Sequence, residues 1–244
     1  MNTEAMEPYG QALLDFFNGD VLAKVAVHRD DGFTDDLVPS GFFRKPSGFS
    51  PLEQTAMMLC RGYTLDIGAG TGCHSLALQD RGIRVLAIDI SPHAIEIMSK
   101  RGVKESQKID VFEFHEGHFD TLLMMHGIGM VEDLSGLERF LCHAHQLLKP
   151  DGQIVFDSLD VSYTDDPRYL AYQEANRRAG RYFGEIRRRF EYKGQMGPFF
   201  GWLHVDLETL INHAERIGWS CQVVYRGEGG DYLAQLTSMG RGVS

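Results

Sequence analysis

Short apolar runs alternate with helix-like stretches between residues 63 and 158. The apolar runs predict strands, which we place at Tyr63–Ile67, Val85–Ile88, Gln107–Ile109, Phe119–Met125 and Gln153–Phe156. Stretches with one apolar face predict helices, which we place at His74–Asp80, after Ser91-Pro92, and at Leu134–Leu148. Strands that alternate with helices are typical of βαβ units. This part of the chain therefore predicts a parallel sheet.

The same pattern resumes after residue 205. An amphipathic helix is expected over Asp206–Ile217, followed by strands at Ser220–Tyr225 and Asp231–Thr237. The glycine-rich turn Arg226–Gly230 joins these two strands, and such a turn makes an antiparallel pair. We therefore expect an α/β fold whose core comprises residues 63–158 and 206–244, with seven strands and an antiparallel last strand.

Two segments flank or interrupt this core. Residues 159–205 are too long for a simple loop. They predict a helix at Pro167–Arg178 and a β-hairpin that pairs Tyr182–Tyr192 with Phe199–Val205. This insertion is expected to cap a substrate or to mediate oligomerisation. Residues 1–62 are expected to form an N-terminal helical or lid segment, with a helix at Pro51–Leu59.

Composition excludes several classes of protein. The 34 acidic and 24 basic residues leave a formal charge of -10, which repels a nucleic-acid backbone. No long apolar run suits a membrane span, and the start MNTEAMEPYG lacks the basic flank of a signal peptide, so we expect a cytoplasmic protein. The dispersed cysteines and the absence of an HExxH motif predict reduced thiols and no metal site. These cysteines are Cys60, Cys73, Cys142 and Cys221.

The strongest chemical signal is the segment LDIGAGTG at Leu65–Gly72, where a strand leads into a helix. Without a Cβ, the backbone amides of such a loop can approach a polar or anionic ligand. The dinucleotide motif GxGxxG would need glycine at Cys73, so NAD is the weaker interpretation. Asp89 ends the second strand nineteen residues after Gly70, where its carboxylate can accept hydrogen bonds from both ribose hydroxyls.

These features together resemble the class I S-adenosylmethionine-dependent methyltransferases. The resemblance covers about residues 63–158 and the last forty residues. It is carried by LDIGAGTG, VLAID, Asp110-Val111, FDTLLMM and LLKPDGQIVFDS. It implies a Rossmann-like seven-stranded sheet with an antiparallel last strand, and S-adenosyl-L-methionine as the cofactor.

The resemblance also implies roles for individual residues. The glycine loop would pack against the methionine part of the cofactor, whose amino group Asp66 would position. Asp89 would hold the ribose, and Asp110 with its neighbour would recognise adenine. Other interpretations stay open, because Asp66 could instead cap the loop amides and Asp110 or His74 could face solvent. The expected cofactor-binding residues are Arg44, Asp66, Gly68, Ala69, Gly70, Gly72, His74, Asp89, Ile90, Asp110, Val111 and Met125.

The segment after the fourth strand points to a small acceptor. Members of the family that methylate nucleobase amines carry a (D/N)PPY-type motif there, whereas this chain reads Met125-His126-Gly127-Ile128-Gly129. His126 follows a buried strand, and an ordinary histidine pKa near ~6.5 suits proton removal, so it is our candidate catalytic base. A histidine that only shapes the pocket is the alternative. Arg44 could pair with the cofactor's carboxylate or an acidic substrate, or lie on the surface.

Arginine and aromatic residues concentrate in the insertion. The strand alternation places Arg188 on the apolar face, so we expect it to contact an anionic or aromatic substrate while Arg187 and Arg189 face outward. The expected substrate-contacting residues are Phe43, Tyr182, Arg188 and Trp202. Alternatively, the outward arginines pair with Glu185 and Glu191 or with a second copy in a homodimer. A non-catalytic cofactor-binding regulator or subunit is the competing function.

Overall fold

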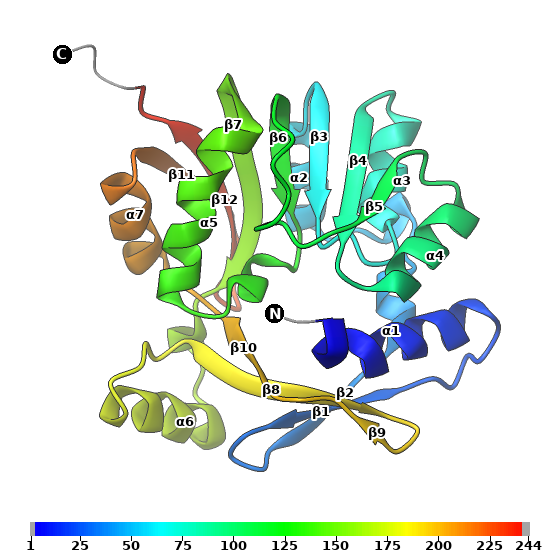
Figure 1. The fold of residues 1–244 in the computed structure, drawn as a ribbon. Helices are drawn as coiled ribbons and strands as arrows, with labels where there is room; N and C mark the ends of the chain where they lie inside the picture. Colours follow the sequence, from blue (N-terminus) through cyan, green and yellow to red (C-terminus); the bar gives the residue numbers. More distant parts are fainter. Residues whose placement is uncertain (1–2, 241–244) are drawn as a thin grey trace.

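The computed structural model describes residues 3–240, so the ends of the expected segments 1–62 and 206–244 lie outside the described residues. Its larger sheet has seven strands in the order β11-β12-β7-β6-β3-β4-β5 (Figure 1). β12 runs antiparallel to both of its neighbours, and the other pairs are parallel. The predicted Rossmann-like sheet is confirmed. Its strands are β3 (Tyr63–Ile67), β4 (Arg84–Asp89), β5 (Ser106–Lys108), β6 (Phe119–Met124), β7 (Leu148–Leu159), β11 (Trp219–Arg226) and β12 (Asp231–Ser238).

Helices cover both faces of this sheet. Because neighbouring residues of a strand point to opposite faces, Leu122 and Leu123 enter different parts of the core. Leu122 packs in the cluster that includes α5 and α7, and Leu123 in the cluster that includes α2 and α3. The apolar run Leu122–Met124 of β6, buried on both faces, is typical of a parallel sheet covered by helices on both sides. The helices are α2 (Pro51–Leu59), α3 (Cys73–Asp80), α4 (Pro92–Arg101), α5 (Leu134–Leu147) and α7 (Leu207–Arg216).

The turn that the sequence pattern predicts between the helix at Leu134–Leu148 and the strand at Gln153–Phe156 does not form. Residues 149–152 were expected to separate α5 from a strand starting at Gln153, but β7 begins at Leu148, directly after the helix. The register against β6 shifts there, because Phe119 pairs with Leu148 and Thr121 with Gln153. Pro150 has no N–H to donate to a ladder, so the chain bulges while staying extended.

A second sheet combines the N-terminal segment with the insertion. Its order is β10-β8-β1-β2, and β9 pairs with β8. The insertion forms the expected helix and hairpin, but the N-terminal segment is not wholly helical, because β1 and β2 form a hairpin that extends the inserted one. The elements are β1 (Val25–Arg29), β2 (Thr34–Leu37), α6 (Pro167–Arg178), β8 (Glu185–Tyr192), β9 (Gln195–Met196) and β10 (Phe200–Leu203).

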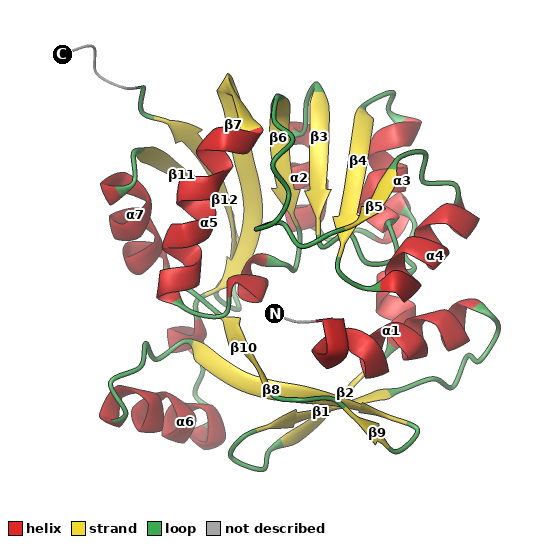
Figure 2. Ribbon diagram, in the orientation of Figure 1, coloured by secondary structure: helices red, strands yellow, loops and turns green. Residues whose placement is uncertain are grey.

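The first helix lies between the two sheets. α1 (Thr3–Phe17) packs its alanines, Ala5 and Ala12, in one cluster with Phe190 and Phe200 of the second sheet. Figures 1 and 2 show that β3 and β4 point with their carboxyl ends toward α1 and the second sheet. Ligands of open α/β sheets bind at this edge. Within residues 3–240, the helices are too short or too polar to cross a membrane.

Candidate functional site

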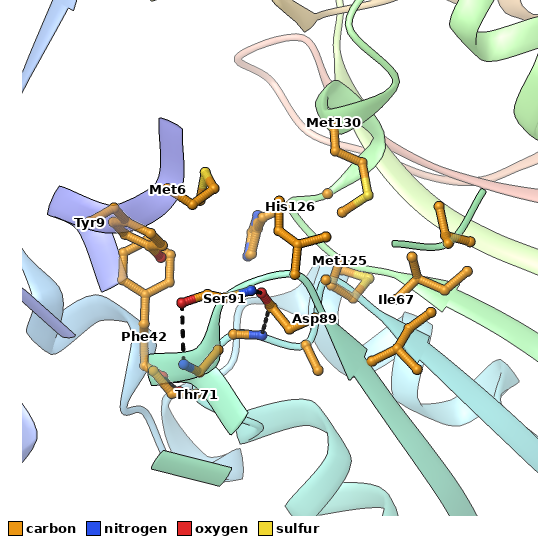
Figure 3. Close-up of a pocket in the computed structure, with 18 of the residues that line it drawn as sticks. Met6, Tyr9, Phe42, Ile67, Thr71, Asp89, Ser91, Met125, His126 and Met130 are labelled. Carbon is orange, nitrogen blue, oxygen red and sulfur yellow. Dashed lines mark hydrogen bonds between the residues drawn. The ribbon is translucent and has the colours of Figure 1, made fainter. Parts of the chain in front are cut away.

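A cavity lies between the carboxyl ends of β3, β4 and β6 on one side and α1 on the other. Its empty space, including open solvent at its mouth, is about 1120 Å³. Figure 3 shows Tyr9 and Phe42 on one side, Met125 and Ile67 on the other, and Asp89 between them. The predicted residues that line it are Arg44, Gly68, Ala69, Gly70, His74, Asp89, Ile90, Asp110, Val111, Met125, His126 and Trp202.

Five other predicted site residues do not line this cavity. Asp66 is buried beneath the loop and accepts a hydrogen bond from Ser75 Oγ, and burial raises the pKa of its carboxyl. Gly72 precedes α3, where an added Cβ would press on Met98 and Val103. Asp66 and Gly72 therefore support the loop rather than face a ligand.

The other three serve different neighbours. Phe43 packs on the α1 residues Phe16 and Phe17, with ring centroids 5.1 and 6.1 Å away. Tyr182 donates its hydroxyl to Asp206, the residue that caps α7. Arg188 lines a second cavity, which lies between the second sheet and the segment that follows β7. The four expected substrate-contacting residues therefore do not form one wall. Trp202 lines the first cavity, Arg188 lines the second, and Phe43 and Tyr182 line neither.

The glycine loop is shaped to hold a ligand. Gly68 and Gly70 have φ angles of 68° and 56°, in the left-handed region that favours glycine. The amides of Gly68 and Ala69 donate to the Ile88 carbonyl oxygen, which ties the loop to β4. An added Cβ at Gly70 would meet only a distant carbonyl oxygen, so it would project into the space that a ligand needs.

Asp89 is held in place by the backbone. Its Oδ2 accepts from Gly70 N at 2.9 Å and its Oδ1 from Ser91 N at 2.8 Å. Burial raises the pKa of this carboxyl, although the two amide donors oppose that change. Each carboxylate oxygen keeps acceptor capacity toward the cavity. Such a fixed carboxylate can receive the two hydroxyls of a ribose.

A buried carboxylate, Glu53, joins several cationic side chains below the loop. It is 1% exposed and accepts from both terminal nitrogens of Arg44, at 2.9 and 2.6 Å. It also lies 2.9 Å from His74 Nε2, and it accepts from Ser50 N at 2.9 Å. Burial would raise the pKa of Glu53, but the hydrogen bonds from His126, His74 and Ser50 outweigh it and lower the pKa.

The sequence analysis missed Glu53. Its signal is the segment Ser50-Pro51-Leu52-Glu53, a capping box in which Ser50 and Glu53 satisfy each other's backbone at the start of α2. That pattern explains an acidic residue by the helix alone. Its second role depends on Arg44 and on His74 of α3, which only the fold brings to it.

His126 lies between two carboxylates and faces the cavity. Its Nδ1 is 3.2 Å from Asp157 Oδ2, its backbone N–H donates to Asp157 Oδ1 at 2.6 Å, and its Nε2 is 3.5 Å from Glu53 Oε1. Its φ of 56° is a left-handed conformation that a non-glycine residue rarely adopts, and such strain is typical of functional sites. Asp157 and Glu53 raise the pKa of His126 to about 9, against the expected value near ~6.5.

Comparisons with known proteins agree with this geometry. A family described as a methyltransferase domain matches residues 65–156. The demethylmenaquinone methyltransferase of Tropheryma whipplei is 36% identical over 97 residues, 37% of this chain and 39% of that protein. The ubiquinone biosynthesis O-methyltransferase of Aromatoleum aromaticum is 29% identical over 107 residues, 41% and 44% of the two chains. The matches thus span about two fifths of these curated relatives.

A solved structure matches over nearly the whole chain. It is a SAM-dependent methyltransferase from Bacteroides fragilis in complex with S-adenosyl-L-homocysteine. Its TM-score is 0.84 and its sequence is 36% identical, over 98% of this chain and 97% of that one. The similarity therefore includes the second sheet as well as the core.

Proposed function

Because this chain belongs to the S-adenosylmethionine-dependent methyltransferases and S-adenosylmethionine is the cofactor of that family, we propose that it methylates a small molecule. The observation that carries this proposal is the position of His126 and Trp202 in the wall of the cavity that Gly70 and Asp89 also line. Side chains of α1 close the same cavity on the side opposite the strand ends. A covered site of this kind favours a small acceptor over a polymer.

We assign different parts of the cavity wall to different parts of the cofactor. The glycine loop faces the methionine part, Asp89 the ribose, and the slot lined by Asp110, Val111 and Phe112 the adenine. We assign Arg44 to Glu53 rather than to the cofactor's carboxylate, because both of its terminal nitrogens already donate to Glu53. The bound cofactor supplies an electrophilic methyl group on sulfur.

His126 and its neighbours are assigned to the positioning and deprotonation of the acceptor. Methyl transfer is an in-line displacement, so its rate depends on holding a lone pair of the acceptor against the methyl carbon. We propose that His126, once deprotonated, takes the proton from an acceptor oxygen or nitrogen, while Asp157 fixes the orientation of the ring. The quinone-pathway names of two relatives support a small, aromatic acceptor.

A homodimer through the exposed arginines stays a prediction, which light scattering tests.

Calorimetry and turnover test the function. The protein is expected to bind S-adenosylmethionine and S-adenosylhomocysteine at least tenfold more tightly than NAD, by about 1.4 kcal/mol or more. Incubation with S-adenosylmethionine and a metabolite mixture is expected to release S-adenosylhomocysteine. Cofactor binding with no turnover across such mixtures would favour the non-catalytic regulator, and tighter binding of NAD would contradict both proposals.

Replacing Asp89 with alanine is expected to weaken cofactor binding by ~1.5–3 kcal/mol, because hydrogen bonds to a charged acceptor contribute about this much. Calorimetry with S-adenosylhomocysteine measures the change. Glu96→Ala on the exposed side of α4 is the matched control, and its affinity should equal the wild type's. Unchanged affinity in a folded Asp89→Ala variant would refute the ribose assignment.

A further inference from the structure

A second cavity lies between the second sheet and the segment that follows β7. Its empty space, including open solvent at its mouth, is about 1280 Å³. Ile186 and Arg188 of β8, Val27 of β1 and His204 after β10 line it together with residues 159–165. No role in cofactor binding falls to it, since the glycine loop and Asp89 line the first cavity.

A side chain that lines the second cavity contacts one that lines the first cavity. The guanidinium carbon of Arg188 lies 3.9 Å from the ring centroid of Trp202, and Trp202 lines the first cavity. The Trp202 ring in turn packs on Gly129, where an added Cβ would lie 2.1 Å from a ring atom. Gly129 follows His126 by three residues. A group bound at Arg188 would therefore lie across the Trp202 ring from the first cavity, which His126 also lines.

Arg188 carries a charge that the described residues leave unpaired. Within residues 3–240 it forms no ion pair with a carboxylate, and its buried Nε has no hydrogen-bond partner. Arg29, which lines the same cavity, instead pairs with Asp31 at 2.7 Å. Burial lowers the pKa of Arg188 to about 10, so it stays a cation at neutral pH. Arg188 is half-buried, and a charge that is partly removed from water is more favourable when an anion pairs with it.

The side chains nearest to Arg188 do not supply that partner. His204 is neutral, because burial and the charge of Arg188 lower its pKa to about 4. Phe190 and Phe200 surround the guanidinium with centroids 5.7 and 5.5 Å away. The aromatic rings contact the guanidinium without a carboxylate or carbonyl that would accept its hydrogen bonds. Its planar fork matches a carboxylate through two parallel hydrogen bonds.

We propose that Arg188 binds a carboxylate of the methyl acceptor in the second cavity, so that the acceptor's reacting atom reaches past Trp202 toward His126. The proposal rests on the proposed function, since it names the class of acceptor for that reaction. Acidic side chains line the outer part of the same cavity, at Asp35, Asp36, Asp160 and Asp165. Because these side chains repel anions, the part of the acceptor that lies beside them is expected to be neutral or cationic.

Small carboxylates and their amides test the proposal. The protein is saturated with S-adenosylhomocysteine and titrated with acetate, benzoate and phenylacetate, and with acetamide, benzamide and phenylacetamide. At least one carboxylate is expected to bind about tenfold or more tightly than its amide. Arg188→Gln should abolish this preference, whereas Arg187→Gln, on the exposed face of the same strand, should keep it. Equal binding of every acid and amide pair, or a preference retained by Arg188→Gln, would overturn the proposal.

The affinity for S-adenosylhomocysteine is measured separately for each protein. A wild type that does not bind it would refute the proposed function, whereas binding of it without any carboxylate preference would refute only the role of Arg188. An Arg188→Gln variant that loses S-adenosylhomocysteine instead of the carboxylate would assign Arg188 to the cofactor and so overturn the proposal. Should this variant not fold, Arg188→Lys replaces it: at least threefold weaker carboxylate binding supports the proposal, and unchanged binding overturns it.

Discussion

Replacing His126 with alanine is expected to lower the rate of methyl transfer by about 100-fold or more, because general base catalysis commonly contributes a factor of this size. Cofactor affinity should stay within a few-fold of the wild type, since we assign that binding to the glycine loop and Asp89. Single-turnover rates and calorimetry measure the two quantities. A rate within a few-fold of the wild type would leave His126 as part of the cavity wall.

The pH dependence gives a sharper test of the same role. Asp157 and Glu53 raise the pKa of His126 to about 9, so the ring holds a proton at neutral pH and cannot accept another. A base is active only above its pKa. The kcat/KM for the acceptor is therefore expected to rise with pH, with a midpoint well above the ~6.5 of an ordinary histidine. The positive sulfonium of a bound cofactor would bring that midpoint below 9.

Asp157→Asn serves as the matched variant for this profile. The asparagine keeps the shape of the side chain but removes the negative charge 3.2 Å from His126 Nδ1. The pKa of His126 should fall, and the rising limb of the profile should move to lower pH. A limb that stays in place in Asp157→Asn, or a rate that falls with rising pH, would show that another group controls the reaction.

The sequence predicts the core well because its signals are local. The spacing of apolar runs sets the strands β3 and β4, and LDIGAGTG sets the loop between β3 and α3. Asp89 ends the same β4 strand, so its position beside the loop follows directly from the order of the elements. A parallel sheet leaves few arrangements for such a sequence of strands and helices.

The second sheet could not be predicted in the same way. β1 pairs with β8, for example through Ala26 and Glu191, which are far apart in the sequence. Short strands such as β1 and β2 carry little pattern of their own, and their pairing depends on a partner that arrives much later in the chain. Met6 and Tyr9 of α1 line the first cavity, and they lack a sequence signal for the same reason.

Replacing Glu53 with glutamine is expected to have the largest effect on stability. The glutamine keeps the shape and a capping side chain but leaves the Arg44 guanidinium and the histidines without their shared carboxylate. Removing one partner of a buried ion pair commonly costs about 3–5 kcal/mol. Because Arg44 is one third exposed and the histidines can lose their protons, we expect a loss near the lower limit, about 3 kcal/mol. Urea denaturation measures the free energy of unfolding.

The loss should depend on pH in a defined direction. Glu53 has a lowered pKa, so its contribution is present above its ordinary value of 4.5 and is lost only in strong acid. His74 has a raised pKa of about 10, because its hydrogen bonds to Cys73 and Glu53 outweigh burial, so its contribution is complete below 6.5 and fades toward 10. The destabilisation is therefore expected to be greatest between pH 4.5 and 6.5 and smaller at pH 9.

An exposed carboxylate provides the control for both measurements. Glu96 pairs with Lys100 on the surface of α4, and Glu96→Gln should leave the free energy of unfolding unchanged within the error of the measurement. Glu53→Gln should also lower the pKa of His126, but only partly, since Asp157 remains beside Nδ1. The midpoint of its rate profile should then lie between that of the wild type and 6.5. A stability loss below 1 kcal/mol near pH 6, or a midpoint equal to the wild type's, would show that Glu53 does not compensate these cations.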